Sequence, residues 1–87
     1  MTVKKDRLYA TWQRIRRVCN SVGHPSFKHY GGKGIIICEE WDDFSAFCYW
    51  AVENGWDSTS NDCFIRRYDE DDDFCPDNCY VYWKNPR

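Results

Sequence analysis

Cysteine is the residue type in this chain that is best suited to hold a metal ion. Six cysteines occur among 87 residues, and Cys75-Pro-Asp-Asn-Cys79 places two of them at a C-x3-C spacing. That spacing is compatible with part of a tetrahedral zinc site. The polar N-terminal sequence lacks the apolar core of a signal peptide, so we expect a cytoplasmic protein with reduced cysteines. Some of them, such as Cys48, are expected to be small buried hydrophobes instead.

An acidic run next to these cysteines offers a different chemistry. It consists of Asp69, Glu70, Asp71, Asp72 and Asp73. Consecutive acids repel one another and resist ordering without compensation, and calcium loops need spaced ligands with a glycine between them. The run could be a solvated loop or could bind a cation. It could also imitate the phosphates of nucleic acid and bind the basic groove of a nucleic-acid enzyme.

Basic residues are concentrated at the other end of the chain. Residues 1–37 carry a formal charge of +7 and residues 38–87 a charge of −9, so the net charge of −2 conceals two surfaces of opposite sign. The basic half could be an ordinary solvated surface or could contact phosphates. The candidate phosphate contacts are Lys4, Lys5, Arg7, Arg14, Arg16, Arg17, Lys28 and Lys33.

Two helices and a hairpin are expected to position these groups. Apolar residues recur at helical spacing over residues 6–20, and a second helix over residues 42–54 ends before a glycine. The β-branched run at residues 35–38 predicts a short buried strand. Residues 63–68 and 79–84 are typical of two antiparallel strands joined by the acidic loop.

The size and composition of the chain fit one domain. Eighty-seven residues are near the lower limit for a single core, and the 5 Trp, 6 Tyr and 5 Phe supply large apolar areas to bury. No stretch of about 20 apolar residues is present, so we expect no membrane partner. The sequence therefore predicts a single α+β domain over residues 1–87, with two helices packed on a small antiparallel hairpin.

Three blocks, residues 17–41, 44–56 and 65–83, follow one another in an order found in a known family. The first contains the run Tyr30-Gly-Gly-Lys-Gly-Ile35, and the last contains Asn78-Cys79 close to its end. Together the blocks resemble small phage HNH-type endonuclease-like domains. The resemblance implies an HNH-like finger, and the chain ends where the final helix of that finger would begin.

The resemblance also implies that catalysis has been lost. Counting back from Asn78 places Arg66 and Arg67 where the family has an aspartate and a histidine that serve metal binding and water activation. Arginine stays protonated and repels a divalent ion. We therefore assign no catalytic residue. A divergent metal-dependent nuclease, with His29 supplying the missing base, remains as a third alternative.

The family's cysteine positions add to the metal hypothesis. Cys19, Cys38 and Cys79 match positions that are cysteine in the phage domains, and Cys75 would be the fourth ligand of a structural zinc ion. Cys75 is not part of the family's pattern, and His24 competes with it as a ligand.

Two main functions remain, and they differ in the partner. Because DNA-binding domains of this size are usually clearly basic, we favour an inhibitor that binds a host nucleic-acid-processing protein through its acidic, aromatic surface. Such a protein would be of anti-restriction or anti-CRISPR type and act in the host cytoplasm. The alternative is a DNA-binding module that uses the basic half.

Overall fold

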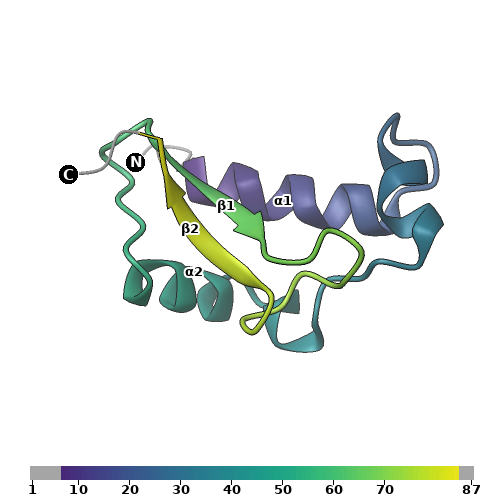
Figure 1. Cartoon of the computed structure of the whole chain (residues 1–87). Helices are drawn as coiled ribbons and strands as arrows, with labels where there is room; N and C mark the ends of the chain where they lie inside the picture. The colour runs from purple at the N-terminus through teal and green to yellow at the C-terminus, as the bar shows by residue number, and fades with distance from the viewer. Residues whose placement is uncertain (1–6, 85–87) are drawn as a thin grey trace.

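The computed structural model describes residues 7–84, which form two α-helices, three 3₁₀ helices and one two-stranded antiparallel sheet. The helices are α1 (Arg7–Asn20) and α2 (Phe44–Glu53), and the strands are β1 (Cys63–Arg67) and β2 (Cys79–Trp83). In Figure 1, α1 runs behind the hairpin and α2 lies below it. This arrangement confirms the predicted α+β class. The predicted lack of a final helix concerns residues 85–87, which lie outside the described part.

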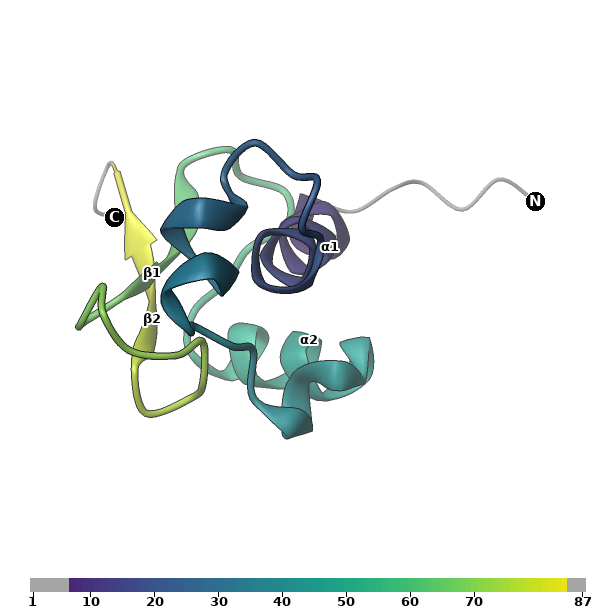
Figure 2. The ribbon, with the colours of Figure 1, turned by 90° about the vertical axis from the view of Figure 1, so that its right-hand side faces the viewer.

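Helix α1 forms where the apolar spacing predicts it. Leu8, Trp12, Ile15 and Cys19 recur at helical spacing, and all four are buried. The helix therefore packs one stripe against the rest of the domain and leaves its other faces to polar side chains. Figure 2 looks along α1, with the hairpin on one side and α2 below, and the core lies between them.

Helix α2 is defined by its caps. The Asp43 carboxylate accepts a hydrogen bond from the Ser45 amide at 3.1 Å, which satisfies a free donor of the first turn. Gly55 follows the helix with φ of 99°, a conformation that glycine adopts without strain. Trp12 of α1 donates its indole N–H to the Trp41 carbonyl at 2.7 Å, just ahead of α2. That bond fixes the two helices relative to each other.

The predicted strand at residues 35–38 is reduced to a single bridge. Ile37 pairs in parallel with Phe74, and the bridge is closed by Phe74 N–H to the Ile36 carbonyl at 2.9 Å and Cys38 N–H to the Phe74 carbonyl at 2.8 Å. The prediction of a full strand was wrong because the segment pairs with its partner at one residue, Phe74, within the described part of the chain. The bridge nevertheless attaches the end of the acidic loop to residues 36–38.

The hairpin forms over the two predicted strands, and its side chains alternate between two faces. Phe64 lies opposite Tyr82 and Arg66 opposite Tyr80, while Cys63 and Cys79 point to the core and are buried. Antiparallel pairing places every second residue of both strands on one outer face. The hairpin therefore carries an aromatic side that is not used by the core.

Between α1 and the bridge the chain turns through two short 3₁₀ helices, Phe27–His29 and Gly31–Lys33. Gly31 is required there, because a Cβ at this position would collide with the Cys19 carbonyl oxygen and the Phe27 ring. Within residues 7–84 there is no helix with both the length and the apolar character needed to cross a bilayer.

Candidate partner-binding surface

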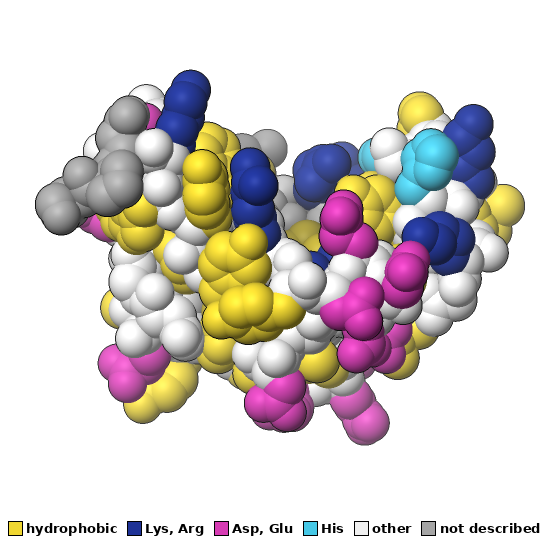
Figure 3. Space-filling model, viewed as in Figure 1, with side chains coloured by type: hydrophobic (Ala, Val, Ile, Leu, Met, Phe, Trp, Pro, Cys, Tyr) yellow, Lys and Arg dark blue, Asp and Glu magenta, His cyan; other side chains and the backbone are white. Residues whose placement is uncertain are grey.

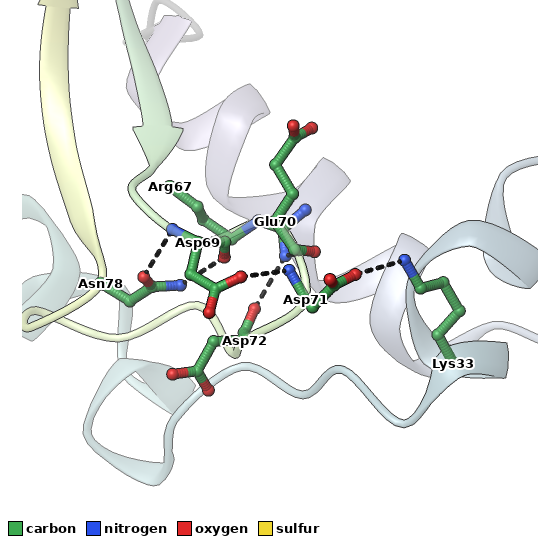
Figure 4. Close-up of polar contacts among 7 residues, drawn as sticks. All are labelled: Lys33, Arg67, Asp69, Glu70, Asp71, Asp72 and Asn78. Carbon is green, nitrogen blue, oxygen red and sulfur yellow. Dashed lines mark hydrogen bonds and ion pairs between the residues drawn. The ribbon is translucent and has the colours of Figure 1, made fainter.

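The acidic loop between the strands is held in one shape by the side chain of Asn78. This amide donates to the carbonyls of Asp69 and Asp73, each at 2.9 Å, and accepts from the Asp69 N–H at 3.0 Å. Asn78 is only 6% exposed. Because its donors and acceptor are all used, the buried amide stabilises the loop rather than destabilising the core. Figure 4 shows Asn78 bound to Asp69 at the base of the loop.

Arg67 provides the second support. Its Nη1 donates to the carbonyls of Glu70 and Asp72, both at 2.7 Å (Figure 4). Its guanidinium carbon lies 4.5 Å from the Phe74 ring centroid and 5.3 Å from that of Tyr30. A planar cation is suited to satisfy two carbonyls while it stacks on rings. Arg67 therefore shapes the loop, at a position where the resemblance would place a catalytic group.

The five carboxylates of the predicted acidic site differ in their hydrogen bonds and in their exposure. Asp69 and Asp73 accept hydrogen bonds from the N–H groups of Asp71 and Ile36, each at 2.9 Å, so they help to fold the loop. Asp72 also accepts a hydrogen bond, from the Asp73 N–H at 2.7 Å. Asp69, Glu70, Asp71 and Asp72 are all exposed, and Asp73 is half-buried. The expectation that a run of acids needs compensation is met by Arg67 and Asn78.

One of the exposed carboxylates, that of Asp71, forms an ion pair. Lys33 Nζ lies 3.0 Å from Asp71 Oδ1, with the Asp71 side chain 82% exposed. An exposed pair of this kind contributes about 0–1 kcal/mol. It does not neutralise the loop, whose other exposed carboxylates remain open to solvent.

The outer face of the hairpin carries Phe64, Arg66, Tyr68, Tyr80 and Tyr82, which we call the aromatic face. Tyr68 is 71% exposed and its ring centroid lies 4.6 Å from that of Tyr80, while the Arg66 guanidinium stacks 4.1 Å from the Tyr82 ring. In Figure 3, hydrophobic and basic side chains lie together over the hairpin, with acidic side chains beside them. The aromatic face and the acidic loop thus form one continuous surface.

A hollow of about 380 Å³ deepens this surface between α1 and the hairpin. Its walls include Thr11 and Arg14 from α1, and Arg66, Tyr68 and Tyr80 from the hairpin side. Arginine lines it on both sides and tyrosine on the hairpin side, so it can accept a protruding group of either polar or aromatic character.

The alternation of strand β2 places Tyr80 and Tyr82 on one side, and that much can be seen in the sequence. The sequence predicted an acidic, aromatic surface without naming its aromatic residues, because which of them share a face depends on strand pairing. The spacing of Phe64, Arg66 and Tyr68 on the first strand is the signal that could have found it.

The candidate phosphate contacts do not form one surface. Arg7 lies 5.0 Å from the Trp56 ring and donates to the carbonyls of Ser60 and Cys63 at 2.6 and 2.7 Å, so it joins α1 to the segment before the hairpin. That internal role leaves Arg7 a poor phosphate contact.

Of the remaining basic residues, Arg16 and Arg17 line one hollow on α1, and the others are scattered. Lys33 pairs with the acidic loop, and Arg16 stacks on the Trp12 ring at 4.9 Å. Three others are exposed, namely Arg14, Arg17 and Lys28. Lys4 and Lys5 lie outside the described residues.

The six cysteines are all free thiols. Of the four predicted zinc ligands, Cys38, Cys75 and Cys79 lie near one another, since the charge of Cys75 acts on the pKa of the other two. The charges that act on Cys19 are those of Arg67 and Asp73. Burial raises the pKa of Cys79 to about 12, that of Cys19 to about 11, and that of Cys38 above its usual range.

Metal binding requires thiolates, so a zinc ion would have to displace the protons of these buried thiols. His24, the competing ligand, accepts a hydrogen bond at Nδ1 from the Ser26 N–H at 3.0 Å. Across residues 7–84, no three His, Cys, Asp or Glu side chains are grouped so that they could hold a metal ion. Structural zinc stays a prediction, to be checked by elemental analysis of protein purified without chelator.

Comparison with protein-family models, curated proteins and solved structures finds no match to this chain.

Proposed function

We propose that this protein is a binding module that covers the basic, nucleic-acid-binding surface of another protein. The observation that carries the proposal is the continuity of the aromatic face with an ordered acidic loop. The aromatic face supplies apolar contact area, and the acidic loop supplies negative charge. A basic nucleic-acid-binding surface offers positive charge for the loop and apolar contacts for the aromatic face.

The aromatic face has the composition of an interface centre. Tyrosine, tryptophan and arginine are the residues that most often dominate binding energy when they become fully desolvated. Here Tyr68 and Tyr80 lie side by side, and Arg66 stacks on Tyr82. Their mutual contacts hold the rings in place before a partner arrives, which lowers the entropy lost on binding.

The acidic loop adds charge in a fixed geometry. Arg67 and Asn78 hold its backbone, so Glu70, Asp71 and Asp72 are presented without the cost of ordering the loop at the moment of binding. Exposed carboxylates at an interface rim speed association with a basic partner and reject an acidic one. The loop therefore favours a basic partner.

Direct binding of nucleic acid by this surface is less well supported. Exposed aromatics can stack on bases, but the neighbouring carboxylates would repel the phosphates that join those bases. Arg16 and Arg17 line a hollow away from this surface, and Arg7 is engaged internally.

The resemblance to phage HNH-type domains suggests in which organism and against which kind of target the protein would act. With Arg66 and Arg67 at the catalytic places, the chain would keep the shape of a nuclease domain without its chemistry. We infer an inhibitor of anti-restriction or anti-CRISPR type that acts on a nucleic-acid-processing protein in the host cytoplasm.

Affinity capture from a host lysate, with and without nuclease treatment, tests this proposal. We expect capture of a basic nucleic-acid-binding protein that survives nuclease. Tyr68→Ala should abolish capture, while Tyr49→Ala, a tyrosine that is also 71% exposed but lies on α2, should not.

Charge variants provide a second matched pair. Neutralising the exposed acids of the loop (Glu70→Gln, Asp71→Asn and Asp72→Asn) should weaken capture. Neutralising the exposed acids of the 3₁₀ helix Glu39–Asp42 (Glu39→Gln, Glu40→Gln and Asp42→Asn) changes the charge equally and should leave capture intact. Loss of the captured protein on nuclease treatment would instead indicate a nucleic-acid bridge and refute the proposal.

A further inference from the structure

A second hollow, also of about 380 Å³, lies along α1 away from the hairpin. Tyr9, Gln13, Arg16 and Asn20 line it at spacings of four, three and four residues, which place them on one helical face. Thr11 belongs to the hollow beside the hairpin. The two hollows are therefore on different faces of the same helix.

The chemistry of the α1 hollow is that of hydrogen-bond donors. Its walls carry the guanidinium groups of Arg16 and Arg17, the amides of Gln13 and Asn20, and the Ser21 hydroxyl. No carboxylate is among its lining residues. A cationic hollow without an acid of its own is suited to an anion.

The surroundings of Arg16 independently indicate that the hollow binds an anion. Its guanidinium is stacked 4.9 Å from the Trp12 ring, and its Nε is buried without a hydrogen-bond partner. A buried donor that lacks an acceptor destabilises the protein relative to one that is satisfied. A small outward turn of the guanidinium toward an anion in the hollow would give this donor its acceptor.

We propose that the α1 hollow binds a phosphate group. A phosphate offers three strong acceptor oxygens, enough for both guanidiniums and a neighbouring amide, whereas a carboxylate offers two. The negative end of the helix dipole near Asn20 opposes an anion but loses its effect within one turn. The phosphate is therefore placed toward Gln13 and Arg16.

The phosphate could belong to a free phosphate ion or nucleotide, or to a nucleic-acid backbone. A backbone held by two arginines should lose affinity with salt at a log–log slope of about −2. Inorganic phosphate has no such polyelectrolyte behaviour. The salt dependence thus separates the two sources of the same chemistry.

Titration of the intact protein with inorganic phosphate, in chloride buffer at constant ionic strength, tests the site. The Nε–H resonances of Arg16 and Arg17 should shift saturably. Arg17→Gln and Arg16→Lys should each weaken binding by about tenfold. Arg14→Gln, which removes the same charge from an exposed position on the other face, should change it by less than about twofold.

A parallel titration with a short DNA duplex identifies the source. Binding with the predicted salt slope and with sensitivity to Arg17→Gln assigns the site to a nucleic-acid backbone, whereas binding of inorganic phosphate alone assigns it to a free phosphate group. Unshifted resonances, or equal effects of Arg17→Gln and Arg14→Gln, would overturn the proposal. Neither titration involves the aromatic face. Failure of the phosphate proposal can therefore be distinguished from failure of the proposed partner binding.

Discussion

Replacing Arg67 by alanine should unfold the acidic loop and destabilise the whole domain. The change removes two hydrogen bonds of 2.7 Å to the carbonyls of Glu70 and Asp72, and the stacking on Phe74 and Tyr30. Arg66→Ala is the matched control, because Arg66 is the preceding arginine on the same strand and is exposed.

The magnitude follows from these contacts. A hydrogen bond from a charged group contributes about 1.5–3 kcal/mol when buried. Arg67 is half-buried, so we take about 1 kcal/mol for each bond and about 1 kcal/mol for the two ring contacts together. Arg67→Ala should therefore cost about 3 kcal/mol. Arg66→Ala removes one exposed ring contact, with Tyr82, and should lower the free energy of unfolding by about 0.5–1 kcal/mol.

Urea unfolding followed by tryptophan fluorescence measures both values. The expected difference of about 2 kcal/mol corresponds to about 10 °C in Tm for a domain of this size. Amide exchange should also accelerate at residues 69–73 in Arg67→Ala, because the loop carbonyls lose their donor. Equal unfolding free energies for the two variants would refute the structural role assigned to Arg67.

Three further predictions concern the loop, the glycine turn and the thiols. Asn78→Asp should destabilise the domain by about 3 kcal/mol, because it replaces two donations by repulsion from two carbonyls, whereas Asn61→Asp at an exposed site should be nearly neutral in urea unfolding. Gly31→Ala should lower Tm strongly through overlap with neighbouring backbone, and Gly23→Ala, with no atom within 4 Å of the new Cβ, should not. Because burial raises the pKa of Cys79 to about 12, the folded chain keeps a proton that the unfolded chain releases from about pH 8.5 upward. The contribution of Cys79 to the free energy of unfolding should be fully present below that pH and should be lost as the pH rises toward 12. Under reducing conditions, Cys79→Ala should reduce the fall in urea midpoint between about pH 8 and 11.

Local signals predicted most of the secondary structure. The stripe from Leu8 to Cys19 specifies α1, and Asp43 and Gly55 mark the limits of α2, because helical spacing and capping depend on neighbours along the chain. The prediction of a strand at residues 35–38 was wrong because strand formation depends on residues far away in the chain. Whether a β-branched run forms a strand depends on its partner, and Phe74 supplies only one residue of pairing.

The candidate site was only partly readable from the sequence. Its acidic residues form a run in the sequence, but the run does not indicate which carboxylates, among them Asp69 and Asp73, accept the backbone hydrogen bonds that fold the loop. Arg67 was noticed only as the loss of a catalytic group. Its support of two carbonyls follows from where the loop returns in space, and side-chain spacing does not encode that path.

The affinity of the captured partner for Tyr68→Ala and Tyr49→Ala, measured in nuclease-treated solution, tests the central claim most directly. A tyrosine at the centre of an interface costs about 2 kcal/mol or more when truncated, so Tyr68→Ala should weaken binding by at least about 30-fold. Tyr49→Ala, which is 71% exposed like Tyr68, should change it by less than about twofold. Equal affinities for the two variants would contradict docking through the aromatic face.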